Sequence, residues 1–173
     1  MHVHRFERVW LVAALGMIVL FIGTVTYGAV AAGYGMVDAE GGQVDATDPT
    51  TSESFREPGV YEGNESDHYD VYVEARRFAF IPGSADPIRV PADSTVTFHV
   101  ASADVLHGFE VAGTNINTMA IPGQKAMVTA EFDEPAEYGI VCNEYCGAAH
   151  HDMAGTLEVV PQSEFNATAE ASA

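Results

Sequence analysis

The residues best suited to chemistry in this 173-residue chain lie together near its C-terminal end. The segment CNEYCGAAHHDM, residues 142–153, holds both cysteines, Cys142 and Cys146, followed by His150 and Met153. Two thiolates, an imidazole and a thioether form a soft set of metal ligands, which selects copper over magnesium or calcium. The residue types and their spacing therefore predict a metal site in this segment.

Two simpler structures account for the same spacing. Two cysteines outside the cytoplasm often form a disulfide, and intervals of four, four and three residues place the four side chains on one face of a helix. A helix is disfavoured because one β-like run ends at Cys142 and another begins by Gly155, which leaves a loop between strands. A disulfide gives no reason for a histidine and a methionine to follow at these intervals.

A further strong ligand must come from elsewhere in the chain, and His107 is the best candidate. It lies at the edge of a predicted strand, in DVLHGF, before a turn-prone stretch. His99 alternates within a strand, which is typical of a packed or surface residue, and His151 points away from its neighbour His150. Zinc bound by two cysteines and two histidines is an alternative, although it leaves Met153 without a role.

Two thiolates are one more than a mononuclear blue-copper site uses, so the segment favours two bridged copper ions. Each ion then takes one histidine, with Met153 and a backbone carbonyl as weaker ligands. An oxidised pair with three positive charges keeps one after binding two thiolates and becomes neutral on gaining an electron. Because the electron is shared over two metals, each bond changes little, and such a site suits electron transfer.

The element before this chemistry is an apolar stretch that predicts a transmembrane helix. No charged residue occurs between Arg8 and Asp38, a run of 29 residues, whereas about 20 residues span a bilayer. A signal peptide has a shorter apolar region, of about 7 to 15 residues, although AVAAG near the end of the run resembles its cleavage site. The length, and Trp10 at an interfacial position, favour a retained helix from about Val9 to Ala31.

Charge predicts the orientation of this helix and excludes one class of partner. Arg5 and Arg8 precede it and no basic residue follows until Arg56, which places the N-terminus in the cytoplasm and the rest of the chain outside the plasma membrane.

The net charge of −18 divides into +1 for residues 1–8 and −19 for the remainder, which excludes nucleic acid as a partner. With Lys125 as the single lysine, the scattered acids suit a salt-tolerant surface, as in a haloarchaeal protein, or an acidic docking face.

Beyond the helix, composition predicts a small β domain between two irregular segments. Short runs with alternating or β-branched residues, separated by Pro-Gly and Pro-Ala-Asp turns, predict six or more strands and hence a small antiparallel sandwich. The predicted parts of the chain are a cytoplasmic N-terminus at 1–8, a transmembrane helix and exit at 9–37, an acidic flexible linker at 38–68, the β domain at 69–160 and a disordered tail at 161–173.

These features together resemble subunit II of haem-copper cytochrome c oxidases, whose external domain is a cupredoxin-like Greek-key β-sandwich with a binuclear copper centre called CuA. The family loop, Cys-x-Glu/Gln-x-Cys-x-x-x-His-x-x-Met, is matched at every position, and the upstream family histidine matches His107 in VLHGFEVAGTNIN. The resemblance implies bridging thiolates and two terminal histidines, with a thioether and a carbonyl completing the set. These ligands are Cys142, Cys146, His107, His150, Met153 and the main-chain carbonyl of Glu144.

The resemblance implies an electron-accepting subunit of a terminal oxidase. It takes single electrons at CuA from a soluble donor, a cytochrome c or a small blue-copper protein, and passes them to the haem in subunit I. There dioxygen is reduced to water and protons are pumped, so this chain carries no catalytic residue for the oxygen chemistry. Two alternatives stay open: an electron-input subunit of a CuA-containing nitric oxide reductase, and a non-redox zinc domain.

Two departures from the common family pattern resemble its B-type branch, in which subunit II has a single helix. The chain has one helix, and Phe78 and Phe80 stand where most relatives have a tryptophan-rich stretch on the electron path. In that branch a glutamate before the helix lies at the start of a proton pathway, and Glu7 matches it. In A-type enzymes the residue at Glu144 helps to bind magnesium at the interface with subunit I; the alternative is a solvated acid that contributes its carbonyl alone.

Overall fold

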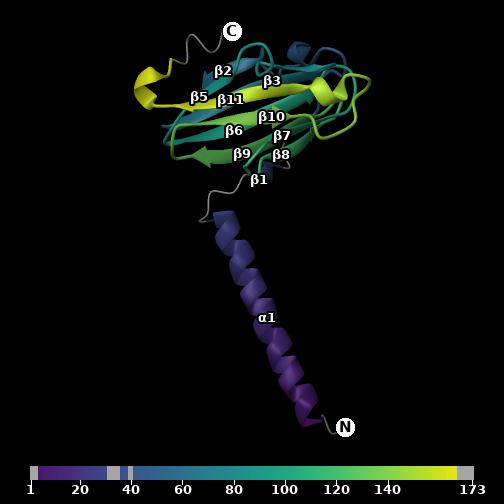
Figure 1. Ribbon diagram of the computed structural model, residues 1–173, viewed down its shortest axis with the longest axis vertical. Coiled ribbons are helices and arrows are strands. Elements are labelled where there is room, and N and C mark those ends of the chain that lie inside the picture. The colour runs from purple at the N-terminus through teal and green to yellow at the C-terminus, as the bar shows by residue number, and fades with distance from the viewer. Residues whose placement is uncertain (1–3, 31–35, 39–40, 167–173) are drawn as a thin grey trace. The chain divides into compact units, whose positions relative to one another are not determined.

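The computed structural model comprises two compact units, the first of which is a single helix. The described residues are 4–30, 36–38 and 41–166. Helix α1 spans Arg5–Val30 (Figure 1). Its 26 residues extend about 39 Å at 1.5 Å per residue, which exceeds the roughly 30 Å hydrocarbon core of a bilayer. Together with its apolar composition, this length makes α1 sufficient to cross a membrane.

Helix α1 begins four residues before the predicted start at Val9, and Glu7 caps this first turn. The backbone N–H of His4 donates to Glu7 Oε2 at 2.8 Å, and the backbone N–H of Phe6 donates to His4 Nδ1 at 3.4 Å. These contacts satisfy N–H groups that have no partner within the helix. Glu7 therefore has a local structural role at the helix N-terminus.

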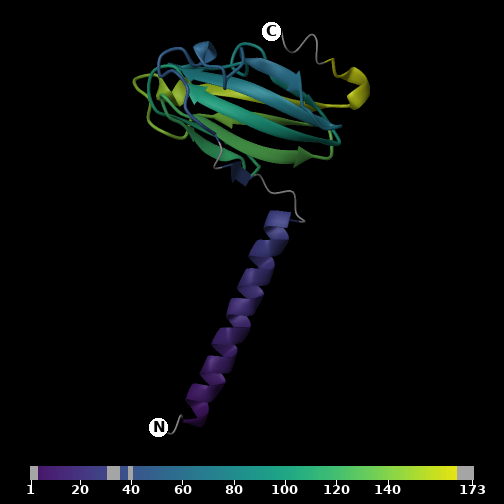
Figure 2. The same cartoon turned by 180° about the vertical axis from the view of Figure 1, so that it is seen from behind.

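The second unit is a sandwich of two β-sheets. The first sheet has the order β1-β9-β6-β3-β2, with β4 beside the end of β3, and the second has the order β5-β11-β10-β7-β8. Strands β10 and β11 lie on the near side in Figure 1, and the turned view in Figure 2 brings the first sheet to the front. The first sheet contains β1 (Met36–Asp38), β2 (Gly59–Glu62), β3 (His68–Arg76), β4 (Ala79–Ile81), β6 (Ser94–Ser102) and β9 (Lys125–Phe132). The second contains β5 (Ile88–Pro91), β7 (His107–Val111), β8 (Asn117–Ala120), β10 (Ala136–Val141) and β11 (Ala154–Val160).

Apolar side chains from both sheets fill the space between them. Val71 and Val73 of β3 are fully buried at a spacing of two residues, as expected for one face of a strand. The ring of Phe109, on β7, lies 5.5 Å from that of Phe80 and 5.6 Å from that of Phe98. This aromatic cluster supports β7, the strand that begins with one of the predicted metal ligands.

Two strand pairs differ from the predicted antiparallel sandwich. Strand β3 pairs with β6, and β5 with β11, in parallel, whereas the other strand pairs of the described residues are antiparallel. The chain between β3 and β6 runs through β4 and β5, a connection long enough to return to the starting end of the sheet. Alternation of side chains indicates a buried face but carries no information on strand direction.

The prediction of a flexible linker at 38–68 is wrong for the described residues, because this segment is part of the sandwich. Strand β1 extends the first sheet beside β9, and β2 pairs with β3. Between them, residues 43–58 form a strap on the outer face of that sheet, where Phe55 is 3% exposed and packs edge-on against Tyr72 at 5.3 Å. The few apolar residues of the strap are isolated among polar ones, so they show no periodicity in the sequence.

The predicted disordered tail is also wrong where the structure describes it. Residues 162–164 form a short 3₁₀ turn, and the ring of Phe165 packs edge-on against Tyr69 at 5.1 Å. This ring contact and a hydrogen bond from Gln162 Nε2 to the Ala92 carbonyl at 3.3 Å hold the turn against the sandwich. The remainder of the predicted tail, 167–173, lies outside the described residues.

Candidate metal centre

Two parts of the second sheet bring the predicted ligands together. His107 is the first residue of β7, and 142–153 is the segment that joins β10 to β11. The two ends of this segment lie side by side, because the backbone N–H of Cys142 donates a hydrogen bond to the carbonyl of Met153 at 3.2 Å. Its only regular structure is a short 3₁₀ turn at His150–Asp152, so the prediction of a loop rather than a helix is confirmed.

The segment 142–153 is the ligand loop, and Asn143 joins its start to β7 and β8 by hydrogen bonds. Its Nδ2 donates to Glu110 Oε2 at 2.9 Å and to Asn117 Oδ1 at 3.2 Å. A side chain at Gly108 would collide with Asn143, so glycine is required at this point of β7. The residue after His107 thus allows the two ligand-bearing segments to approach each other closely.

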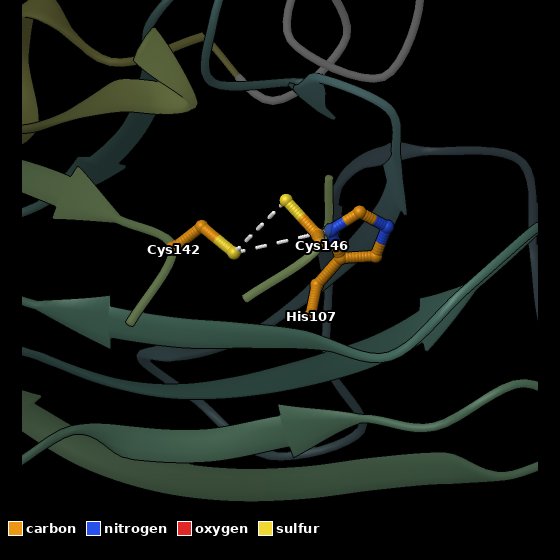
Figure 3. A group of neighbouring side chains, drawn as sticks. All are labelled: His107, Cys142 and Cys146. Carbon is orange, nitrogen blue, oxygen red and sulfur yellow. Dashed lines mark hydrogen bonds between the residues drawn. The ribbon is translucent and has the colours of Figure 1, made fainter. Parts of the chain in front are cut away.

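The two thiols form the centre of the site (Figure 3). Cys142 and Cys146 are buried and not bonded to each other, and their Sγ atoms lie 3.8 Å apart. A metal–sulfur bond of about 2.3 Å lets one ion contact two sulfurs up to about 4.6 Å apart, so both thiols can bind the same ion. The arrangement fits metal ligands rather than the disulfide alternative.

Each thiol has a different histidine beside it. His107 Nδ1 lies 3.9 Å from Cys142 Sγ, and His150 Nδ1 lies 3.5 Å from Cys146 Sγ. In Figure 3 the Cys142 side chain points toward both Cys146 and the His107 ring, and these three ligand atoms lie within 4.8 Å of one another. The imidazoles therefore present one nitrogen each, next to different sulfurs.

Two weaker donors lie against the same sulfurs. Met153 Sδ is 3.7 Å from Cys146 Sγ, and the carbonyl oxygen of Glu144 is 3.2 Å from Cys142 Sγ. Met153 is buried, whereas Glu144 is exposed and contributes only its backbone to this cluster. All six predicted ligands are thus neighbours, and sulfur, imidazole and thioether donors are the set that suits copper.

Asp104, which the sequence did not mark as part of the site, holds the far side of the His107 ring. Its Oδ1 accepts a hydrogen bond from His107 Nε2 at 2.8 Å and one from the Val105 N–H at 2.6 Å, and its Oδ2 accepts one from the Arg77 N–H at 2.9 Å. Partial burial raises the pKa of Asp104, but these hydrogen bonds outweigh it and the pKa lies below its usual range. A carboxylate on one ring nitrogen fixes the ring so that the other faces the metal.

Burial controls the electrostatics of the Cys146 thiol. It raises the pKa of Cys146 to about 11, and the neighbouring Cys142 thiol acts in the same direction. Because the thiolate is the form that binds metal, a metal ion must displace a proton here. A buried thiolate is stable only beside positive charge, which a bound cation supplies.

The other predicted residues lie outside this cluster. Phe78 is half-buried beside Gly147, where an added Cβ would come within 3.2 Å of its ring, and Phe80 is buried in the core of the sandwich. Glu7 belongs to the helical unit. His99, which the sequence predicts to be packed or at the surface, is buried and hydrogen-bonded to Asp70. The roles of the two phenylalanines and of Glu7 stay predictions.

The fold and the site together define the class of this protein as cupredoxin-like with a candidate metal centre. The second unit is a cupredoxin-like β-sandwich in which a soft His, Cys and Met donor set occupies the loop between its last two sheet-forming strands and the start of a neighbouring strand. A helix sufficient to cross a membrane precedes it.

The chain belongs to the family of cytochrome c oxidase subunit 2, as the predicted resemblance implies. The family described as "Cytochrome C oxidase subunit II, periplasmic domain" matches residues 82–160. Cytochrome c oxidase subunit 2 of Thermus thermophilus is 37% identical over 161 residues, which cover 89% of this chain and 91% of that protein. The chain is therefore a component of an oxidoreductase complex.

Solved structures agree with this assignment. A chain in a cryo-EM structure of a heme-copper terminal oxidase dimer is 30% identical with a TM-score of 0.63, covering 90% of this chain and 99% of that chain. The periplasmic domain of cytochrome oxidase subunit II from Bradyrhizobium japonicum has a TM-score of 0.52 at 20% identity, covers 56% of this chain and 86% of that chain, and supports the fold alone. The predicted cupredoxin-like fold is confirmed, and α1 with a periplasmic-domain family indicates a single-pass membrane protein.

Proposed function

We propose that this chain is the electron-accepting subunit of a terminal haem-copper oxidase and that its six clustered ligands form a binuclear CuA centre. Single electrons from a soluble donor, a cytochrome c or a blue-copper protein, would reach the haem of subunit I through it, for reduction of dioxygen to water coupled to proton pumping. The pairing of two central thiols with two histidines, one beside each, carries the proposal. The relatives are named cytochrome c oxidase and terminal oxidase, which favours dioxygen over nitric oxide as the acceptor.

The positions of the weaker donors favour two copper ions over one zinc ion. A tetrahedral zinc site uses four donors and leaves Met153 and the Glu144 carbonyl without a role. Both lie beside a ligand sulfur, at 3.7 and 3.2 Å, and Met153 is only 2% exposed. A buried thioether next to two thiols matches the preference of copper for soft ligands.

The residues of this chain contribute a donor set in which four of the six residues are buried. Cys142, Cys146 and Met153 are buried, and His107, 0% exposed, is fixed by Asp104. A bound copper pair would supply the uptake and release of single electrons. Because the donors are already held close together, little of the protein has to move when an electron arrives.

The rim of the site suits a docking partner that binds through apolar contact. Leu106, Val141 and Tyr145, each next in sequence to a ligand, are exposed, and the ring of Tyr145 lies 5.7 Å from that of His150. The proposal is that the soluble donor docks on this rim and that Phe78, beside the ligand loop, lies on the electron path. Apolar docking tolerates an acidic donor, because salt screens the repulsion between two acidic proteins.

The charges around α1 support the proposed orientation of the chain. Arg5 and Arg8 favour a cytoplasmic N-terminus, which would put the copper domain on the outer side of the plasma membrane. Glu7 would then lie at the cytoplasmic end of the helix, where a proton pathway of subunit I can begin. A Glu7→Gln oxidase tests this role, because glutamine keeps the oxygen that caps His4 but cannot release a proton. We expect slower turnover and reduced pumping, and unchanged values would exclude the role.

Glu144 has a second proposed role, in which it would bind magnesium at the interface with subunit I. Its exposed carboxylate is a hard oxygen donor of the kind that magnesium prefers. The competing interpretation is a solvated acid whose carbonyl is its only functional atom. Metal analysis of the intact complex tests this point, and the absence of magnesium would leave Glu144 with its backbone role.

Copper reconstitution of the full chain in detergent tests the central proposal. We expect two copper ions per chain and a purple mixed-valence species whose unpaired electron is shared equally by two coppers in the paramagnetic resonance spectrum. A Cys146→Ser variant should lose this species. A blue single-copper spectrum, or a colourless protein that holds zinc, would overturn the proposal.

A further inference from the structure

The turn between β3 and β4 contacts both segments that carry the predicted metal ligands. The backbone N–H of Arg77 donates to Asp104 Oδ2 at 2.9 Å, and the side-chain Nε of the same residue donates to the carbonyl oxygen of Cys146 at 3.2 Å. These partners are 27 and 69 residues away in sequence. One residue thus joins the segment before β7 to the ligand loop.

One of these hydrogen bonds reaches a ligand through Asp104, and the other is made directly to the backbone of the ligand residue Cys146. The other carboxylate oxygen of Asp104 binds His107 Nε2 at 2.8 Å. The Cys146 carbonyl belongs to the residue whose thiol lies 3.8 Å from Cys142 Sγ and 3.5 Å from His150 Nδ1. Holding this carbonyl restricts the rotation of the backbone that directs the Cys146 thiol.

Phe78, the residue after Arg77, packs against the ligand loop at the same place. Gly147 has φ +136°, a conformation that favours glycine, and a Cβ there would lie 3.2 Å from two ring carbons of Phe78 and 3.9 Å from Arg77 Nε. The loop therefore lies directly against the turn, with little room between them. Arg77 and Phe78 together form the surface against which the ligand loop packs.

Arg77 places one of the few positive charges of this acidic chain beside the candidate metal centre. Its guanidinium donates to a ligand residue, in a protein with a net charge of −18. The other basic side chains of the sandwich have contacts elsewhere: Arg56 over Tyr61, Arg76 with Glu74, Arg89 with Glu158 and Lys125 with the Ser54 carbonyl. Positive charge beside a redox centre favours the state that has gained an electron.

We propose that Arg77 is a positioning residue of the metal centre, which holds the ligand loop against the segment of Asp104 and His107 and raises the reduction potential of the bound copper. The inference rests on the proposed function for its redox part. Its structural part, the fixing of the loop, applies to whichever metal the ligands bind.

Matched variants at adjacent arginines test the redox part in the full copper-loaded chain. Arg77→Gln is expected to keep two coppers and the mixed-valence spectrum but to lower the reduction equilibrium constant by about three- to tenfold, up to 59 mV for one electron. Arg76→Gln removes the same charge one residue away, from a side chain paired with Glu74, and should change the constant less than twofold. Arg77→Lys should restore most of the potential. Equal potentials for the Arg77→Gln and Arg76→Gln variants would refute the redox part.

Hydrogen exchange of the chain before copper loading tests the structural part independently of the metal. Arg77→Gln is expected to speed amide exchange in residues 142–153 by at least fivefold relative to Arg76→Gln. Arg77→Lys should speed it as well, because lysine lacks the rigid guanidinium. Unchanged exchange would refute the fixing of the loop. If wild-type chain fails to take up two coppers, the proposed function fails, and the exchange result still decides the role of Arg77.

Discussion

The orientation of one imidazole affects how tightly this site can bind metal. His107 Nδ1 faces the sulfurs because Nε2 is held by Asp104, and the Asp104 carboxylate also binds two backbone N–H groups. Partners of this kind contribute about 10- to 100-fold to metal affinity. The geometry at His107 is therefore a property of the Asp104 segment as much as of the histidine.

Asp104→Ala should weaken copper binding by about 10- to 100-fold, because the imidazole loses the group that fixes it. Competition with a chelator of known affinity measures the effect. Asp152→Ala is the control, since Asp152 is an exposed acid in the ligand loop whose partner is His151 and not a ligand. A loss below threefold in Asp104→Ala, or an equal loss in the control, would contradict the role of Asp104.

The predicted site residues and the missed ones differ in how the fold brings them together. Cys142, Cys146, His150 and Met153 are close in sequence, so their spacing alone indicates a site, and a strand edge points to His107. The hydrogen bonds from Arg77 to Asp104 and Cys146 join residues that only the packing of the sheets places side by side. A single sequence contains no local signal for such contacts. DVLH does place an acid three residues before the histidine, the one visible hint of Asp104.

At the level of elements, the strap at 43–58 lies on the outer face of the first sheet, with Phe55 as its large buried side chain. Phe55 packs against Tyr72 there and is almost fully buried. Phe55→Ala should lower the free energy of unfolding by about 3 kcal/mol, because a buried aromatic leaves both a cavity and unburied apolar surface. Urea unfolding followed by the β-sheet circular dichroism signal measures the change.

Glu53→Ala is the matched control on the same strap, since Glu53 is exposed, and its effect should stay within about 0.5 kcal/mol. A loss below about 1 kcal/mol for Phe55→Ala would show that the strap does not contribute to folding. The copper spectrum should be the same in both variants, because the strap contains no ligand.

The hydrogen bond between Asp70 on β3 and His99 on β6 predicts a loss of stability in acid. His99 Nε2 lies 2.7 Å from Asp70 Oδ1, and this bond outweighs partial burial to lower the pKa of Asp70 below 3.8. A lowered folded-state pKa stabilises the fold above the unfolded pKa, and the contribution disappears as the pH falls through the folded value. The free energy of unfolding should therefore fall from about pH 5 to about pH 2 by more in wild type than in Asp70→Asn. Urea unfolding over this range tests it, and equal slopes would contradict the assignment.

The strands that the sequence predicts correctly are those with a clear buried face. Both β6 and β9 contain the alternating or β-branched runs from which strands are predicted. The four-residue strands β2, β5 and β8 are too short to establish a period, and β1 has three residues. Their pairing depends on longer neighbours already in the sheet, which is tertiary information. The same reason explains why the strap and the Phe165 turn resemble irregular segments in the sequence.

For the sandwich as a whole, the distribution of acids favours a salt-tolerant surface over a dedicated docking face. Exposed acids occur on the strap, on strands, on turns between strands and in the ligand loop, including Glu53, Glu131, Glu137, Asp86 and Glu144. Beside the ligands, Leu106, Val141 and Tyr145 are hydrophobic and exposed, and Asp152 is an exposed acid. A uniform acidic surface repels itself at low ionic strength, and this repulsion opposes the compact state.

Raising NaCl from 0.1 M to 1 M should therefore stabilise the sandwich, because the Debye length shortens from about 10 Å to about 3 Å. The expected gain in unfolding free energy is on the order of 1 kcal/mol, since each exposed charge interaction is worth a few tenths. Urea unfolding of the chain at each salt concentration measures it. A variant with four exposed acids neutralised should be more stable at low salt and less sensitive to added salt: Glu53→Gln, Glu57→Gln, Glu131→Gln and Glu137→Gln combined. If the two proteins responded equally to salt, the gain would come from a general effect of salt on apolar burial, and the acidic surface would need another explanation, such as docking of a basic partner.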